Sequence, residues 1–228
     1  MGATTPISGT SPASPEPAAL SAELRATVHE VHERAHHSVY MAALLDGALP
    51  LAAYTLLAEQ YGAIYGALEA ASDTLAEDPV AGPFVIDELR RLPALHADLD
   101  ALGSGIPRIL PSTATYVARL REAAGDPVLY VAHHYTRYLG DLAGGQIVGR
   151  LLSRTYGIDG AGGLFYDFSA LGSPSRFRTR YRELLDTAGW SEADRARLKA
   201  EAVHAFELNI AVLAEMAEEV GLEQPLAS

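Results

Sequence analysis

Cysteine is absent from this chain of 228 residues. Its absence excludes disulfide bonds and thiolate-ligated metals, so any metal ion must be held by histidine, aspartate, glutamate or similar ligands. Basic residues are also scarce, because 17 lysines and arginines face 29 aspartates and glutamates, which gives a formal net charge of −12. A sequence-independent grip on phosphate backbones needs clustered lysine and arginine. Nucleic acid is therefore not an expected partner.

Long apolar runs are missing as well. No stretch approaches the ~20 apolar residues that a helix needs to cross a bilayer. Residues 1–19 are rich in proline, serine, threonine and alanine, with neither a basic start nor an apolar run, which predicts a disordered tail and not a signal peptide. We therefore expect a cytoplasmic protein without membrane attachment, with one domain over residues 20–222 and a frayed end over residues 223–228.

Segments with the β-branched alternation of strands are lacking too, whereas apolar residues recur at helical spacing almost throughout from Leu20 onward. The fold is predicted to be all-α, with roughly six or seven helices. Helix starts are indicated at Ser21, Pro50, Ser112, Asp126-Pro127, Ser173-Pro174, and Ser191 with Asp194. Residues 157–163, GIDGAGG, predict a loop.

The segment from Pro127 to Gly157 is helical in pattern and yet carries glycines at positions 140, 144, 145 and 149. Each interior glycine costs a helix about 1 kcal/mol relative to alanine, so the bare backbone needs a reason. One account is close helix–helix packing, because the glycines form two small-xxx-small pairs. The other is a flat, rigid ligand such as a porphyrin lying against the backbone, with the glycines also permitting a bend. Asp141 would lie beside that bare surface.

Histidines are concentrated in the first predicted helix, where His29, His32 and His36 are spaced by three and four residues and share roughly one face. Any of them is a candidate metal ligand. Residues 32–36, HERAH, also match the HExxH motif, in which two histidines bind zinc and the glutamate is a general base. No further ligand or zincin-like context follows downstream.

A di-iron carboxylate site is a second alternative. Its Glu-x-x-His motif occurs as Glu33 with His36 and again as Glu201 with His204. Further carboxylates could come from positions 59 and 69 on another helix. This interpretation does not explain the glycines of residues 127–157, and its two motifs fall on the first and last predicted helices.

Five segments resemble successive landmarks of the heme oxygenase family, in the family's order: HERAHHSVYM, YGAIYGALE, AHHYTRYLGDLAGGQ, RFRTRYRELL and AFELNI. The resemblance spans residues 20–220, and YTRYLGDLAGGQ is its most specific part because it is close to the family's distal-helix signature. It implies an all-α, single-domain heme oxygenase-like bundle. Heme would lie between a proximal first helix and a kinked, glycine-rich distal helix.

The resemblance also assigns roles to individual residues. His32 occupies the position of the proximal ligand to heme iron, which makes the histidines at 29, 36 and 37 bystanders. Gly140 and Gly144 match the glycines whose backbone contacts the distal heme face. Asp141 matches the carboxylate that organises the distal water network.

Other positions complete the implied site. Tyr65 and Arg137 fit network positions around the distal aspartate, and Phe206 and Asn209 match pocket positions more loosely. The positions that match those meeting the heme propionates are Arg25, Tyr135, Arg178 and Arg182. Arginine stands at 25 and 178 where relatives often carry lysine, so positive charge is retained. Arginines 178 and 182 are four residues apart and can present one cationic patch to two carboxylates.

The implied activity is oxidative opening of heme, which is both substrate and cofactor, to biliverdin, carbon monoxide and ferrous iron with dioxygen as co-substrate. The α-meso carbon is the expected site, because the cationic positions that orient the ring are filled. No flavin or nicotinamide motif is present, so electrons are expected from a ferredoxin or flavoprotein reductase. That partner would dock through the arginines at 119, 121, 137, 150 and 154. A non-catalytic heme carrier or sensor on the same fold is the alternative.

Overall fold

Helices supply all the regular structure of residues 18–222, which are the residues that the computed structural model describes. In order they are α1 (Leu20–His36), α2 (Val39–Leu45), α3 (Leu51–Thr74), η1 (Gly82–Phe84), η2 (Asp87–Leu89), α4 (Leu92–Ala101), α5 (Pro111–Ala123), α6 (Pro127–Tyr156), η3 (Leu164–Tyr166), η4 (Ser169–Leu171), α7 (Pro174–Thr187) and α8 (Glu192–Glu219), where η marks a short 3-10 helix. The all-α prediction is confirmed. The predicted tail, apart from residues 18 and 19, and the predicted frayed end lie outside the described residues.

Several helix ends lie where the sequence predicts them. Ser191 accepts a hydrogen bond from the backbone N–H of Asp194, and the Asp194 carboxylate accepts one in return, which forms a capping box at the start of α8. Asp126 caps α6, and Gly157 ends it in the left-handed conformation at φ 70°. The count of eight α-helices in residues 18–222 exceeds the six or seven expected, because Ser38 caps a separate α2 directly after α1.

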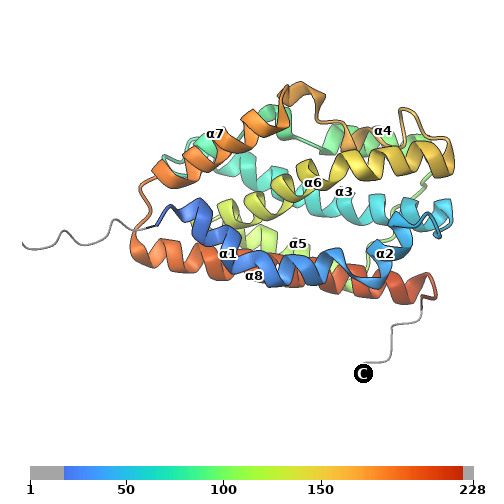
Figure 1. The fold of residues 1–228 in the computed structure, drawn as a ribbon, viewed down its shortest axis with the longest axis horizontal. Coiled ribbons are helices and arrows are strands. Elements are labelled where there is room, and N and C mark those ends of the chain that lie inside the picture. Colours follow the sequence, from blue (N-terminus) through green and yellow to red (C-terminus); the bar gives the residue numbers. More distant parts are fainter. Residues whose placement is uncertain (1–17, 223–228) are drawn as a thin grey trace, which may run out of the picture.

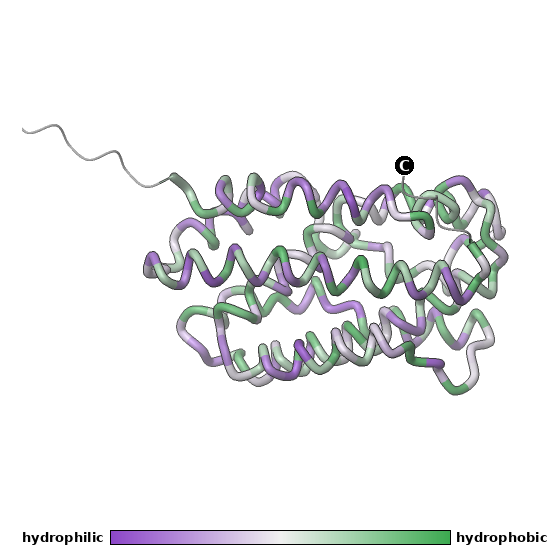
Figure 2. The backbone as a smooth tube through the Cα atoms, turned by 90° about the horizontal axis from the view of Figure 1, so that it is seen from below, coloured by the Kyte–Doolittle hydropathy of each residue, from purple (hydrophilic) through white to green (hydrophobic). Residues whose placement is uncertain are grey.

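The helices form a bundle in which α1 and α8 lie side by side along the length of the molecule, with α6 and α3 beyond them (Figure 1). Helix α8 packs against α1, α2, α5 and α6, whereas α7 lies at the edge of the bundle and packs mainly on α1 and η1. Polar and apolar segments alternate along the helices (Figure 2), as expected where each helix buries one face. Among residues 18–222 no helix has the length and apolar character that a membrane span requires.

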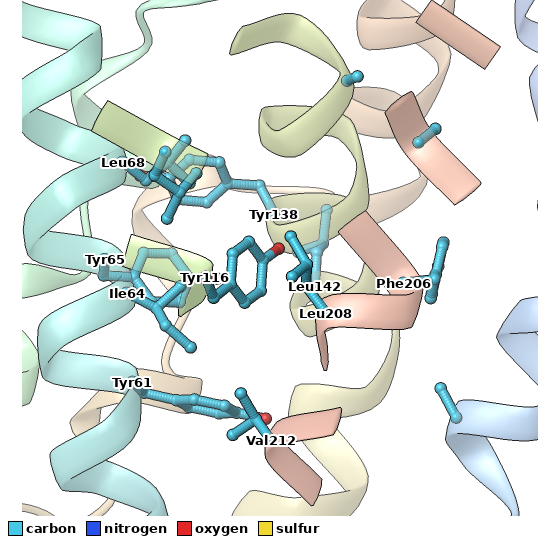
Figure 3. Packing of buried hydrophobic residues seen from close by; sticks show 14 of the residues in the cluster. Tyr61, Ile64, Tyr65, Leu68, Tyr116, Tyr138, Leu142, Phe206, Leu208 and Val212 are labelled. Atoms are coloured by element: carbon cyan, nitrogen blue, oxygen red, sulfur yellow. The ribbon is translucent and has the colours of Figure 1, made fainter. Parts of the chain in front are cut away.

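Tyrosine supplies much of the buried core. The fully buried tyrosines are Tyr40, Tyr54, Tyr65, Tyr116, Tyr130, Tyr138 and Tyr181. A buried phenol usually finds a hydrogen-bond partner, and the hydroxyl of Tyr40 accordingly donates to a backbone carbonyl at 2.8 Å. Figure 3 shows Tyr61 and Tyr65 pointing from α3 toward α6 and α8, with Tyr116 between these helices. These side chains form the packed layer beneath the candidate site.

A buried carboxylate fixes the loop after α6. Asp98 on α4 accepts hydrogen bonds from the backbone N–H groups of Gly162, Leu164 and Phe165 at 2.7 to 2.8 Å. The glycine-rich loop predicted for residues 157–163 is confirmed, but it is firmly tied to α4. The consequence is that η3 packs against the glycine-rich part of α6.

Candidate functional site

Two adjoining cavities lie between α1, α6 and α8. The inner cavity, of about 280 Å³, extends toward α3, and the outer cavity, of about 610 Å³, extends toward α7 and the start of α1. Both are lined by His32, Gly140 and Phe206, so they form one continuous cleft. Nearly every residue that the sequence nominates for the site lies in or beside this cleft.

One wall of the cleft is the helix α1, which presents His32. Val28 and Val31 belong to the buried stripe that packs α1 on the bundle, and His32 lies at the edge of that stripe with half of its side chain exposed. Its Nδ1 is 3.2 Å from a carboxylate oxygen of Glu33, and its ring meets the Phe206 ring edge-on at a centroid distance of 5.7 Å. Within residues 18–222 its Nε2 has no hydrogen-bond partner. An imidazole oriented by a carboxylate at one nitrogen is a typical metal ligand through the other.

The neighbouring histidines differ in position. His36 lines the inner cavity, and its ring lies nearly parallel to that of His32 at a centroid distance of 6.3 Å. His29 lines the outer cavity. His37 turns back to the Glu33 carbonyl at 2.9 Å and lines neither cavity. The prediction that all three are bystanders therefore fits His37 best, since His36 shares the cleft.

The facing wall is the glycine-rich part of α6, where the four glycines have two different surroundings. A Cβ atom built at Gly140 or Gly144 would meet no atom within 4 Å, so both glycines face the open cleft. At Gly145 it would lie 3.3 Å from the Tyr166 ring, and at Gly149 it would lie 3.8 Å from the same side chain. The packing account therefore fits Gly145, where a methyl group would crowd η3, whereas Gly140 and Gly144 leave bare backbone facing the cleft, as the ligand account requires.

Four predicted residues meet in a polar network at the inner end of this wall. Arg137 donates from Nη1 to Oδ1 of Asn209 at 2.8 Å and from Nη2 to Oδ2 of Asp141 at 3.1 Å. The Tyr65 hydroxyl donates to the same Asp141 oxygen. The guanidinium carbon of Arg137 lies 4.5 Å from the centre of the Tyr61 ring. Helices α3 and α6 therefore meet at the Asp141 carboxylate, and α8 joins the network through Asn209 and Arg137.

Burial determines the ionisation of this network. Burial raises the pKa of Asp141, and the nearby Arg137 and the hydroxyl of Tyr65 only partly oppose it. Burial and the neighbouring carboxylate raise the pKa of Tyr65 well above its usual value, so it remains a donor. Burial acts to lower the pKa of Arg137, but the Asp141 carboxylate raises it above its ordinary value. A carboxyl with a raised pKa, held in place by two donors, is suited to taking up and returning protons.

The outer cavity is lined by positive side chains from α1 and α7 and by a tyrosine from α6. These residues are Arg25 of α1, Tyr135 of α6, and Arg178 and Arg182 of α7. Within residues 18–222 none of these arginines has an ion-pair partner. Burial raises the pKa of Tyr135, while Arg182 and Arg25 act to lower it, so its hydroxyl lies in their field. This end of the cleft suits a ligand that carries carboxylates.

Some lining residues were missed by the sequence reasoning. Tyr61 lies four residues before Tyr65 on the same face of α3, so its spacing could have indicated it. Tyr166 comes from η3 beyond the loop and has no periodic signal. The sequence indicates Glu33 only through two metal motifs, whereas in the structure its carboxylate contacts His32.

The carboxylates of the di-iron alternative are engaged elsewhere. Glu201 accepts hydrogen bonds from Arg119 at 2.8 and 2.6 Å and lies 2.8 Å from Nε2 of His133. Glu69 accepts the backbone N–H groups of residues 91 and 92. In residues 18–222 no three histidine or carboxylate side chains gather as a metal site. Neither the di-iron nor the HExxH alternative therefore has an assembled site in this part of the chain.

A helical bundle with a histidine on one wall, bare backbone on the other and arginines at one end defines a binder of flat ligands that carry carboxylates. Comparison with known proteins identifies the class more closely. The Heme oxygenase family model matches residues 18–215, and the chain belongs to the heme oxygenase family.

Individual relatives agree with this assignment. Heme oxygenase 1 of Rattus norvegicus is 35% identical over 207 residues, which cover 86% of this chain and 71% of the relative. The crystal structure of heme oxygenase-1 from Synechocystis sp. PCC6803 in complex with heme has a TM-score of 0.83 at 28% identity, covering 90% of this chain and 96% of that one. The structure of heme oxygenase from Leptospira interrogans has a TM-score of 0.82 at 30% identity, covering 86% and 99%.

Proposed function

We propose that this heme oxygenase binds heme in the cleft between α1 and α6 and that His32 ligates the heme iron. The observation that carries the proposal is the opposition of His32 to the bare backbone of Gly140 and Gly144 across one cleft. The residues fit heme: one imidazole with a carboxylate at Nδ1, space for a flat ring, and arginines for its carboxylates. The Synechocystis relative, which is similar over most of its length, is a complex with heme.

When bound, heme supplies both the iron that activates dioxygen and the ring that is opened to biliverdin, carbon monoxide and ferrous iron. The protein's own residues hold the protons of the reaction and deliver them to the cleft. Asp141 holds and returns a proton at Oδ1, while hydrogen bonds from Tyr65 and Arg137 to Oδ2 fix the carboxyl group in place. Asn209 in turn holds Arg137. Because Gly140 and Gly144 lack side chains, the ligand can lie against α6 and exclude bulk water from that face.

The cationic end of the cleft would set the orientation of the ring in its plane. Arg25, Arg178, Arg182 and the Tyr135 hydroxyl bind the two propionates in this proposal, because charge-assisted hydrogen bonds to carboxylates are strong and directional. A fixed orientation presents one meso carbon to the proton-placing side of the cleft. We assign the α-meso carbon, since every cationic position expected for that orientation is filled.

Electrons would come from an external donor, a ferredoxin or a flavoprotein reductase. Two of the five arginines predicted for its docking are unsuited: Arg137 is buried in the polar network, and Arg119 is paired with Glu122 and Glu201. That part of the prediction is wrong, because sequence alone does not reveal burial and pairing. Arg150 and Arg154 instead line a hollow that shares Ile147 with the inner cavity.

We place the docking site at this hollow. Ile147 is 52% exposed at the border between hollow and cleft, and within residues 18–222 the guanidinium groups of Arg150 and Arg154 have no ion-pair partner. An apolar contact flanked by free positive charge suits a donor with an acidic surface.

The proposed function is tested by adding hemin to the purified protein under air, with a reductase and NADPH or with ascorbate. We expect a Soret band that decays as the broad red absorption of biliverdin grows. His32→Ala should abolish this change, whereas the control His37→Ala, outside both cavities, should retain it. A stable Soret band despite adequate reduction would favour a carrier or sensor, and no Soret band would refute heme binding.

A further inference from the structure

Helix α7 carries two of the proposed propionate ligands but is weakly embedded in the bundle. Its buried stripe consists of Phe177, Tyr181 and Leu185, and both of its flanking loops contain a glycine with positive φ. Its main neighbours are α1 and η1, not α6, which supplies Tyr135 on the other side of the outer cavity. Something must therefore fix the distance between α7 and α6 if the cationic end is to have a defined shape.

One buried polar contact joins these two helices. Nδ1 of His134 on α6 and the hydroxyl of Tyr181 on α7 share a hydrogen bond of 2.7 Å. Their rings are parallel within 6° at a centroid distance of 5.6 Å, and each side chain is at most 1% exposed. His134 is also wedged against Tyr138 at 4.5 Å and Tyr130 at 5.4 Å. Packing thus holds His134 in place, and the hydrogen bond to Tyr181 attaches α7 to it.

The place of this contact in the chain gives it a functional meaning. His134 directly precedes Tyr135, and Tyr181 directly precedes Arg182. The hydrogen bond therefore connects α6 and α7 at positions adjacent to two residues that line the outer cavity. Arg178 lies one turn before Tyr181 on the same helix. Helix α7 is also attached to α1: the backbone N–H and the hydroxyl of Ser21, in the first turn of α1, donate to the carboxylate of Asp186, near the C-terminal end of α7.

We propose that the His134–Tyr181 pair is a positioning element that sets the spacing between α6 and α7 and thereby the in-plane orientation of the bound heme. Neither side chain lines the cleft, so the pair acts through Tyr135, Arg178 and Arg182. The proposal rests on the proposed function, because it concerns which ring carbon is opened. Loss of the pair should loosen α7 and let the ring settle in more than one orientation.

The pair is a constant constraint on α7. Burial lowers the pKa of His134 to about 3, so its imidazole is neutral at physiological pH. Burial also raises the pKa of Tyr181 well above its usual value, so the phenol keeps its proton. A neutral hydrogen bond of this kind persists across the working range of pH.

The first test measures hydrogen–deuterium exchange in the heme-free full chain, which does not depend on heme chemistry. Tyr181→Phe removes the hydroxyl and keeps the ring. We expect amides in residues 174–187 to exchange on the order of tenfold faster, as the loss of one buried hydrogen bond allows. Tyr130→Phe is the matched control, because its hydroxyl lies in the same aromatic cluster but bonds Ser72 of α3. Unchanged exchange in α7 of Tyr181→Phe would overturn the proposal.

The second test measures heme orientation and product. Paramagnetic NMR of the cyanide-ligated ferric complex and separation of biliverdin isomers should both show a minor orientation that is several-fold enriched in Tyr181→Phe and His134→Leu. His134→Asn, which keeps a polar atom near the Nδ1 position, should restore much of the wild-type ratio, and Tyr130→Phe should match wild type. If α7 loosens but the isomer ratio and the NMR pattern stay unchanged, the positioning role is refuted while the proposed function stands. Failure of the wild-type protein to open heme would instead refute the proposed function.

Discussion

At the scale of single residues, Gly140 and Gly144 cost the helix stability and leave its backbone open to the cleft, where the proposed function places the ligand. Gly144→Ala should raise the free energy of unfolding of the heme-free protein by up to about 1 kcal/mol, because alanine favours the helix and its Cβ meets no atom within 4 Å. The same methyl group would occupy the space of the ligand, so hemin affinity should fall on the order of tenfold, a loss of about 1.4 kcal/mol. Thermal unfolding and hemin titration measure the two effects.

Gly145→Ala provides the comparison within the same helix. Its Cβ would lie 3.3 Å from the Tyr166 ring, so the ring must shift and stability should not rise as it does for Gly144→Ala. Hemin affinity should change less than in Gly144→Ala. Wild-type hemin affinity in Gly144→Ala would contradict the placement of the ligand against α6.

Asp141 is the carboxylate that accepts hydrogen bonds from both Tyr65 and Arg137, and the proposed function makes it the proton-transfer group. Asp141→Asn keeps the shape of the side chain but cannot hold and return a proton, so ring opening should slow by about 100-fold or more, the usual range for loss of a general acid–base group. Hemin binding should persist, because the asparagine still fits beside Arg137. Single-turnover decay of the Soret band measures the rate, and Asp159→Asn in the exposed loop after α6 should behave as wild type. A full rate of ring opening in Asp141→Asn would remove this residue from the mechanism.

At the scale of helices, a buried carboxylate fastens α5, α6 and α8 behind the cleft. Glu201 of α8 receives Arg119 of α5 and contacts His133 of α6. Burial acts to raise its pKa, but the hydrogen bonds from His133 and Arg119 lower it to about 2. Burial lowers the pKa of His133, so Arg119 is the partner that carries the positive charge. Because an ordinary glutamate titrates near 4.5, this carboxylate contributes on the order of 1 to 3 kcal/mol to the free energy of unfolding at neutral pH.

The sign of this contribution fixes a pH dependence. A pKa that is lower in the folded state stabilises the protein fully above about pH 4.5, and the contribution is lost as the pH falls toward 2. Glu201→Gln should therefore be less stable than wild type by on the order of 1 to 3 kcal/mol at pH 7, with a difference that shrinks below pH 4.5. Denaturant unfolding at several pH values measures it. Glu122→Gln, which removes the exposed second partner of Arg119, should cost less than about 1 kcal/mol, and an equal loss in both variants would exclude the special role of Glu201.

Which features of these helices could be predicted depends on how local their causes are. The ends of α6 and α8 were readable, because Asp126, Gly157 and Ser191 act within a few residues of themselves. The break between α1 and α2 was missed, because no proline or glycine marks it and its one local signal is the cap residue Ser38. The sequence also did not reveal which glycines of α6 face the cleft, because that depends on Tyr166, which the loop after α6 brings against the helix. The pairing of Glu201 with Arg119 joins residues 82 apart and has no periodic signature.

At the scale of the whole molecule, charge is distributed unevenly. The chain has a formal net charge of −12, and yet arginines without acidic partners in residues 18–222 surround the cleft at its outer end and at the hollow beyond Ile147. A positive region on an acidic protein gives an approaching acidic donor one preferred face, because the rest of the surface repels it. The rate of electron transfer from the donor should therefore depend on the position of each charged residue and not only on the net charge of the protein.

Charge reversal at Arg150 tests this dependence. Arg150→Glu should lower the second-order rate of heme reduction by an acidic ferredoxin or flavoprotein about tenfold at low ionic strength, and added salt should diminish the difference as it screens the interaction. Arg121 was also expected to take part in docking, but it lines neither the cleft nor the hollow. Arg121→Glu therefore makes the same change in net charge at an exposed position outside the proposed docking site, and its rate should stay near that of wild type. Reduction by dithionite should be equal in all three proteins, because a small reductant needs no docking. An equal loss in both variants would mean that total charge alone governs the encounter, and the hollow beside Ile147 would then not be the docking site.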